Sequence, residues 1–304
     1  MDKRSTLNLQ ENRDIWQVLN ATFSFIGMNF KPLYKDVLLI SAPVHILAGV
    51  FYSLSSFGRI LGGFNSIYTS SRYGALQIFS PSYWLFLLCL LFGWALSASV
   101  IGNHVLQFKL HGKGYDVAEA RRGIRKDLWR IFFAGFLNLL LVVAASLLFL
   151  IPGIYLAVAN SLITSVLILD KRIDMIDAFA ESRRLIRDNW WWAFLLGIVV
   201  SIIYYAFITV LRIPSSILSA VILFHTIQNG ANNSGYYEIL FIALNALSYL
   251  GYTLAAPITM VPSCIYYYSL KEKKDHVALM ENINNIGVQP IQTQSETRND
   301  EGDF

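Results

Sequence analysis

The chain has 304 residues, of which 55% are hydrophobic and only 14% are charged, and its formal net charge is +4. A soluble domain needs about 25% charged residues to cover its surface with groups that bind water. The composition therefore excludes an ordinary soluble domain and predicts an all-α integral membrane protein. We expect no nucleic-acid partner.

Six apolar runs are long enough to cross a bilayer. Residues 131–169 show this most clearly, because 39 positions pass without a charged side chain. As one helix they would measure roughly 58 Å at about 1.5 Å per residue, nearly twice a hydrocarbon core of about 30 Å. The chain must therefore cross twice, and Pro152-Gly153 is the predicted reversal. The six predicted spans are about 37–57, 82–107, 129–151, 153–169, 190–211 and 239–270.

Three other segments complete the predicted order. Residues 1–36 are polar or amphipathic and form a cytoplasmic N-terminal segment. Residues 213–227 are apolar but too short to span, and Pro214 stands at their start, so we expect an outer interfacial or re-entrant helix. Residues 271–304 form a cytoplasmic tail that we expect to be largely disordered.

Lysine and arginine fall almost entirely on one side of this arrangement. With the N-terminus inside, 21 of the 24 lie in inner segments, and only Arg59, Arg72 and Arg212 lie outside. Because lysine and arginine favour the cytoplasmic side, we expect both termini in the cytoplasm, in the cell (inner) membrane. Four of the seven tryptophans gather at the predicted inner interface, a depth that aromatic residues favour.

Two connecting segments are alike at an offset of 62 residues. Residues 118–136 and 180–198 are identical at nine of nineteen positions, including an Ala-Glu-x-Arg-Arg-x-Ile-Arg stretch. A fainter third copy at residues 20–30 precedes the first span. Each unit would contain an inner amphipathic helix, an outgoing span and a returning span, giving a parallel internal repeat about an axis along the membrane normal.

The connectors combine an apolar stripe with basic flanks. Val117, Ala120, Ile124 and Leu128 recur at steps of three and four residues. Such a helix can lie in the headgroup layer with its cations on lipid phosphates. Two interpretations stay open: the cations act only as topology signals, or they form a site for anionic lipid or a partner protein. The candidates are Arg121, Arg122, Arg125, Lys126, Arg183, Arg184 and Arg187.

Four uncharged polar residues lie roughly 10–14 Å inside the predicted spans. They are His45, Asn138, Asn160 and Asn245. A bare polar group in hydrocarbon costs several kcal/mol, so each needs a partner. Either each bonds a neighbouring helix, or they converge on a site for a solute or a lipid headgroup. Small residues also recur at steps of four in the spans, which favours close helix packing. They include Ala157, Ser161, Gly197 and Ser201.

A known family becomes recognisable in the third unit. The residues that carry the resemblance are Ile151-Pro152-Gly153-Ile154-Tyr155-Leu156, Ser182-Arg183-Arg184-Leu185 and Asn189-Trp190-Trp191. This pattern resembles the glycerophosphoryl diester phosphodiesterase membrane-domain family, and the resemblance covers most of residues 12–288. The family name implies a membrane partner for a phosphodiesterase domain. The short tail after the last span carries no catalytic pattern, so the chain resembles a stand-alone membrane module, and no enzymatic activity transfers to it.

Motifs of catalytic chemistry were sought in the sequence and not found. No H-E-x-x-H, P-loop or G-x-S-x-G pattern occurs, the five histidines are dispersed, and no paired carboxylates lie at membrane depth. We therefore expect no enzyme, no metal and no cofactor. The leading hypothesis is a non-enzymatic multi-pass module that engages anionic lipid or a partner. The alternative is a transporter of a small solute or lipid that uses the midplane polar residues.

Labelling of intact cells tests the predicted orientation. A cysteine engineered near residue 178, between the second and third units, is expected to resist a membrane-impermeant thiol reagent added from outside, because basic segments stay in the cytoplasm. Ready modification there would contradict the whole arrangement.

Overall fold

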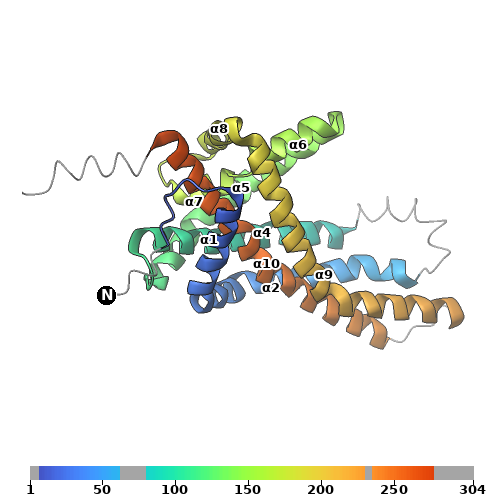
Figure 1. The fold of residues 1–304 in the computed structure, drawn as a ribbon. Coiled ribbons are helices and arrows are strands. Elements are labelled where there is room, and N and C mark those ends of the chain that lie inside the picture. The colour runs from blue at the N-terminus through green and yellow to red at the C-terminus, as the bar shows by residue number, and fades with distance from the viewer. Residues whose placement is uncertain (1–6, 62–79, 230–234, 277–304) are drawn as a thin grey trace, which may run out of the picture.

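The computed structural model describes residues 7–61, 80–229 and 235–276, and all regular structure in these ranges is helical (Figure 1). Within the same ranges, six segments are long and apolar enough to cross a membrane. They are Phe30–Ser56, Pro81–His111, Val117–Leu148, Leu150–Leu169, Met175–His225 and Ile239–Asp275. The prediction of an all-α chain with six potential spans is thereby confirmed.

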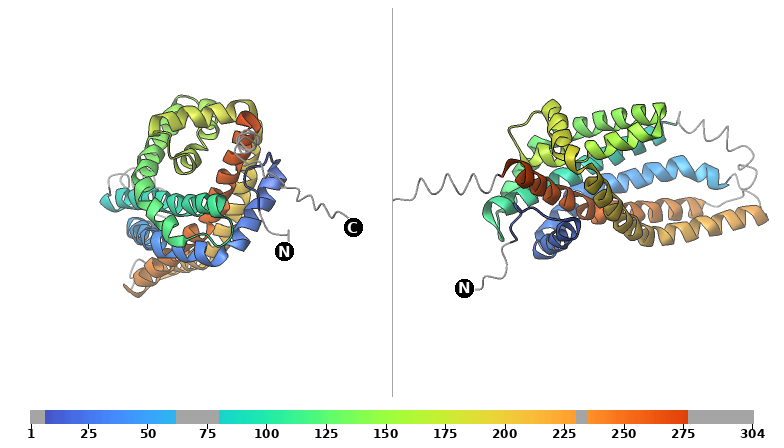
Figure 2. Two further views of the ribbon diagram at one scale, coloured as in Figure 1. Left: turned by 90° about the vertical axis from the view of Figure 1, so that its left-hand side faces the viewer. Right: turned by 45° about the horizontal axis from the view of Figure 1, so that its top comes forward.

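The spans form three consecutive hairpins whose tips point the same way (Figure 2, right). The packed pairs are α2 (Phe30–Leu61) with α4 (Pro81–His111), α5 (Val117–Leu148) with α6 (Leu150–Ala159), and α9 (Trp190–Asn229) with α10 (Gly235–Asp275). The opposite end, called the basic end here, carries α1 (Ile15–Met28), α8 (Met175–Ile186), the start of α5 and the end of α10 (Figure 1).

Contacts between the hairpins are uneven. α10 packs against α2 as well as α9, and α4 packs against α5, so the chain of neighbours runs α9, α10, α2, α4, α5, α6. Only a few contacts join α6 to α9, which would close this ring. The short α7 (Ile163–Leu169) contacts α4, α5, α8 and α10 and so lies inside the bundle (Figure 2, left).

The reversal between the third and fourth spans occurs at Phe149 and not at Pro152-Gly153 as predicted. Phe149 has an extended backbone between α5 and α6. Pro152 falls in the first turn of α6, where a backbone N–H would have no helical partner, so the proline costs little. A Cβ on Gly153 would overlap Ser146 of α5, and this glycine therefore lets α6 return close against α5.

The predicted outer helix at residues 213–227 is also wrong as a separate element. α9 continues through Pro214 to Asn229 and bends along its length (Figure 1). The hydroxyls of Ser215 and Ser216 donate to the carbonyl oxygen of Arg212 at 2.9 and 3.0 Å, a back-bonding that bends helices without ending them. The segment packs against α10 through Leu218 and so forms the far half of α9.

The second connector is not a separate helix in the headgroup layer. α5 runs without a break from Val117 into the predicted span. Ala120 and Ile124 of its apolar stripe are buried in the protein core, so the stripe packs on other helices and not on lipid. The third connector, α8, is a separate helix, but its apolar side is likewise buried, with Ala178 and Leu185 in the core. Because Ala178 is inaccessible, the neighbouring exposed Asp177 is the better position for the cysteine label.

The ends of the membrane segment differ slightly from the predicted limits. α2 begins at Phe30, within the predicted segment 1–36, and α10 extends to Asp275. The rest of the predicted tail lies outside the described residues. The amphipathic α1 begins with a capping box in which Asp14 and Gln17 bond each other's backbone. Its buried Phe25 meets Phe108 of α4 edge to face at 5.2 Å, which anchors α1 in the core at the basic end.

A buried carboxylate joins the first two hairpins at the basic end. Asp36 of α2 is fully buried, and Arg121 of α5 binds both its oxygens, at 2.9 and 2.5 Å. His104 of α4 lies 3.2 Å from Asp36, and its other ring nitrogen lies 2.5 Å from the Tyr115 hydroxyl. A carboxylate only accepts, so His104 Nε2 donates to Asp36 while Nδ1 accepts from Tyr115. Burial, and then the Asp36 charge, raise the pKa of Tyr115, which keeps this donor protonated.

Substitution of Asp36 tests this cluster. Asp36→Ala leaves the buried His104 N–H without an acceptor, so we expect a loss of about 1–3 kcal/mol in the free energy of unfolding. Thermal unfolding in detergent measures it. The matched control is Arg184→Ala, which removes the exposed ion pairs to Glu181 and Asp275 and is expected to cost about 1 kcal/mol or less. Equal effects of the two substitutions would show that Asp36 is not structural.

Candidate functional site

The fourth potential span, Leu150–Leu169, is broken within its length. α6 ends at Ala159, α7 begins at Ile163, and the three residues between them form a turn. Irregular backbone inside a membrane is tolerated only where it is buried in protein or lines a cavity. At the break, backbone groups lose their helical hydrogen-bond partners, and Ser182 of α8 replaces two of them. Its hydroxyl donates to Ala159 O at 2.8 Å and accepts from Leu162 N at 3.3 Å. α8 therefore closes the break.

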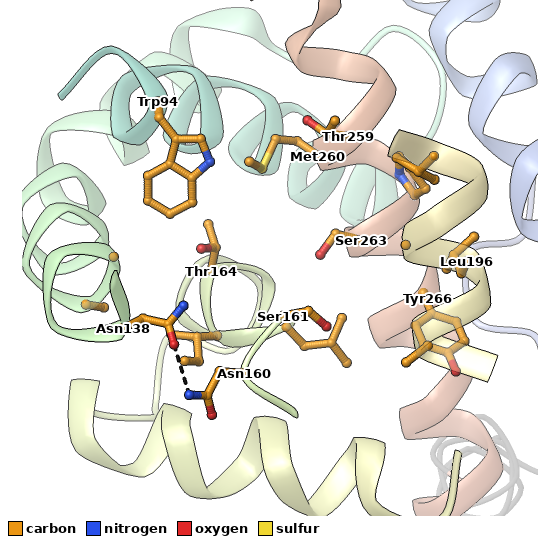
Figure 3. Close-up of a pocket in the computed structure, with 18 residues that line it drawn as sticks. Trp94, Asn138, Asn160, Ser161, Thr164, Leu196, Thr259, Met260, Ser263 and Tyr266 are labelled. Atoms are coloured by element: carbon orange, nitrogen blue, oxygen red, sulfur yellow. Dashed lines mark hydrogen bonds between the residues drawn. The ribbon is translucent and has the colours of Figure 1, made fainter. Parts of the chain in front are cut away.

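Three residues predicted separately meet at this break. Asn160, which is 2% exposed, donates from Nδ2 to Asn138 Oδ1 at 2.9 Å (Figure 3). Arg183 of α8 donates from Nε to Asn160 Oδ1 at 3.0 Å. One of the basic candidates thus bonds Asn160, which in turn bonds Asn138, and the sequence did not predict this link.

A cavity with a mostly apolar lining and a cluster of polar side chains lies beside the asparagine pair (Figure 3). Its volume is about 320 Å³, and it lies between α4, α5, α9, α10 and the broken span. Its polar lining consists mainly of Asn138, Asn160, Ser161, Thr164, Thr259 and Ser263. Since water takes about 30 Å³ per molecule in the liquid, the cavity has room and partners for several waters or a small polar group.

The cavity continues sideways into a groove between α6 and α9. The groove has a volume of about 770 Å³ and shares Ser161, Ala193 and Gly197 with the cavity. The predicted close packing of small residues is wrong here: a Cβ added to Gly197 would meet no atom within 4 Å. Ala157, Gly197 and Ser201 instead line the open groove, because no helix covers them.

A basic pocket of about 420 Å³ lies where α6, α8 and the start of α9 meet. Two of its cations are neutralised inside the protein. Arg184 pairs with Glu181 and Asp275, and Lys274 pairs with Asp188 at 2.8 Å. The other two cations that line the pocket, Arg183 and Arg187, form no ion pair within the described chain.

Arg183 and Arg187 keep free donors in this pocket. Arg183 uses only Nε, on Asn160, and Arg187 makes no ion pair or hydrogen bond with any described residue. Tyr155, Trp190 and Phe194 stack in sequence with ring centroids 5.8 and 5.3 Å apart, and this stack separates the basic pocket from the groove.

The basic candidates on α5 also divide into one that is paired with a carboxylate and three that are not. Arg121 is held by Asp36 and is unavailable to lipid phosphates. Arg122, Arg125 and Lys126 are exposed and make no ion pair or hydrogen bond within the described part of the chain. They form a group of three unpaired cations on one helix at the basic end.

His45 and Asn245 lie away from the cavity. The His45 ring is buried against Gly93 of α4, and its Nδ1 lies 3.0 Å from Ser41 O and 3.1 Å from the Thr253 hydroxyl of α10. Asn245 donates to Phe241 O within its own helix at 2.9 Å. The four midplane candidates therefore divide into one pair at the cavity and two residues with local partners.

Sequence reasoning missed the acidic residues that hold the later spans at the basic end. The buried Asp127 of α5 binds Lys171 and accepts from Asn103 at 2.9 Å. Asp170 accepts from Lys271 at 2.7 Å. Burial raises the pKa of Asp170, but the hydrogen bond and charge of Lys271 outweigh it and leave the pKa below its usual value. The sequence feature that could have revealed them is that Asp127 and Asp170 each stand at the end of a predicted span, directly beside basic residues.

Geometry defines the class as an all-helical protein whose described residues include six segments long and apolar enough to span a membrane, with a basic end and a cavity partly lined by polar side chains. Comparison with models of known families, with curated proteins and with solved structures finds no match. The resemblance to the glycerophosphoryl diester phosphodiesterase membrane-domain family therefore stays an expectation. Among the described residues, no group of three or more His, Cys, Asp or Glu side chains is placed to hold a metal ion.

Proposed function

We propose that this protein is a non-enzymatic multi-pass membrane module whose basic end faces the cytoplasm and binds anionic lipid headgroups. The carrying observation is the surplus of unpaired cations at that end. Arg122, Arg125, Lys126 and Arg187 form no ion pair within the described chain, whereas Arg121 and Arg184 do. Phosphates of an anionic leaflet would supply the missing charge, at about 1 kcal/mol per cation.

Aromatic side chains support this placement. Trp129, Trp191 and Trp192 are 56%, 74% and 58% exposed beside the unpaired cations, where tryptophan marks the headgroup level. The tip of the α5–α6 hairpin, around Phe149, is exposed and apolar. The twenty residues from Trp129 to Phe149 rise about 30 Å, one hydrocarbon thickness. Both termini would then lie in the cytoplasm, in the cell membrane.

The parallel repeat belongs to the same proposal. Asp127 and Asn189 occupy equivalent positions at the offset of 62 residues. Each accepts a hydrogen bond from a lysine at the end of a returning span, Lys171 and Lys273 respectively. The equivalent Gly135 and Gly197 both line the cavity. These paired roles support a common origin for the second and third hairpin units, and the first hairpin, preceded by the amphipathic α1, would be the fainter third copy.

Removal of the unpaired α5 cations tests lipid binding. In Arg122→Ala/Arg125→Ala/Lys126→Ala, we expect the preference for spin-labelled phosphatidylglycerol over phosphatidylcholine at the protein surface to fall, by up to about fivefold per cation. Electron paramagnetic resonance of the reconstituted protein measures this preference, and added salt should reduce it in the wild type.

The matched control removes the same number of charges from the other predicted side. Arg59→Ala/Arg72→Ala/Arg212→Ala is expected to leave most of the preference intact. An unchanged preference in the α5 triple variant, or an equal fall in both, would overturn the proposed function.

The cavity beside Asn138 and Asn160 favours a second candidate function, transport of a lipid or small solute. If the module proposal holds, the protein will not accelerate the movement of headgroup-labelled phospholipid across vesicle membranes, and Asn160→Leu will leave the rate of this movement unchanged. Fluorescence quenching from outside the vesicle measures this movement. Fast movement that Asn160→Leu abolishes, with folding intact and with Asn245→Leu as the unaffected control, would place transport first.

A further inference from the structure

We propose that the groove between α6 and α9 holds one phospholipid, with its phosphate on Arg183 and Arg187 and one acyl chain along the groove. This inference rests on the proposed function, because it names the most specific of the lipid contacts at the basic end.

The groove has the dimensions of one acyl chain in one leaflet. On α9 it extends from Ala193 to Tyr205, twelve residues that rise about 18 Å. Half of a hydrocarbon core of about 30 Å is about 15 Å. The lining is almost entirely apolar and includes Ile154 and Ile202, which are 40% and 65% exposed. The groove therefore opens toward the lipid side of the bundle and not toward its core.

The headgroup end is defined by which cations remain available. Arg183 and Arg187 are four residues apart, so they project from the same side of the chain as α8 ends. Guanidinium groups present paired donors that match phosphate oxygens. Asn160 holds Arg183 through Nε alone, which fixes the side chain and leaves its outer nitrogens free. Arg184 and Lys274 line the same pocket but already have acidic partners, so they contribute little net attraction.

The aromatic stack lies between the two parts of the site. Tyr155 and Trp190 line the basic pocket, and Phe194 lines the groove. Trp190 Nε1 donates to Tyr155 O at 3.4 Å, so the stack bridges α6 and α9 at this level. The glycerol of the bound lipid would lie against this stack, between the phosphate on the arginines and the acyl chain in the groove.

A phospholipid is the occupant that satisfies all three parts together. A soluble phosphate would use only the arginines, and an apolar helix of a partner would use only the groove. Charge complementarity at one end and an open apolar channel of leaflet depth at the other require one molecule with an anionic head and a long chain.

A groove-filling substitution tests the site. Gly197→Leu projects into open space, so it should fold normally, and leucine favours helix more than glycine does. Gly27→Leu is the matched control, because Gly27 lies in α1 and a Cβ there also meets no atom within 4 Å. Native mass spectrometry from mild detergent counts retained phospholipid. We expect one per chain in the wild type and in Gly27→Leu, and at least a tenfold lower occupancy in Gly197→Leu.

Two other measurements identify the ligand. Arg183→Ala/Arg187→Ala should remove the preference for phosphatidylglycerol over phosphatidylcholine in the retained lipid. A phospholipid with a photoreactive group on its acyl chain should crosslink to the α6 and α9 peptides that line the groove. Displacement of the lipid by millimolar inorganic phosphate, or crosslinking of the groove to another protein, would overturn the inference.

The outcomes separate this inference from the function beneath it. If Gly197→Leu retains lipid as well as Gly27→Leu does, while the α5 triple variant still loses its anionic preference, the groove site is wrong and the proposed function stands. If the α5 triple variant also keeps its preference, the proposed function falls as well.

Discussion

The arrangement of the helices depends on keeping buried carboxylates paired at one end of an apolar bundle. A buried ionised carboxylate costs several kcal/mol unless cations and donors surround it. Asp36 meets this condition only where α2, α4 and α5 come together, because His104 and Arg121 reach it from the other two helices. Asp127 with Lys171 repeats the solution for α5 and α7. The basic end is therefore fixed by directional contacts, whereas helices farther along the bundle are free to diverge.

Divergence of α6 from α9 is inexpensive in a membrane. In water, a gap of this size between two apolar helices would close, because exposed apolar surface costs about 25 cal/mol per Å². In a bilayer the acyl chains are as apolar as leucine, so the proposed lipid would fill the gap without that penalty. Gly197 and Ser201 then shape a groove and do not form a helix contact. The cavity beside the asparagine pair and the groove follow from the same asymmetry between a fixed end of the bundle and a loosely joined one.

The number of spans could be predicted from sequence because charge-free length is a local property, clear in residues 131–169. Helix ends were harder to place. Pro152 suits a first helical turn as well as a break, and Pro214 bends α9 without ending it. The depth of Asn138 and Asn160 was also predictable, but their pairing depends on the break in the fourth span, which no local signal marks. Likewise, the step from Gly197 to Ser201 shows which side of a helix is small, but only the tertiary structure shows whether a neighbour covers it.

α8 connects the cavity beside the asparagine pair with the basic pocket. The sequence predicted α8 to be a surface helix with its cations toward the headgroups. In the structure, α8 also buries one side in the helical bundle. Ser182 satisfies the backbone at the break in the fourth span, and Arg183, next in sequence, binds Asn160 at the cavity. Arg187, one turn later, lines the basic pocket and forms no ion pair or hydrogen bond with any described residue. α8 and the residue that caps it thus support the break, orient the asparagine pair and present the two guanidinium groups, so the proposed headgroup site and the geometry of the cavity depend on the same short segment.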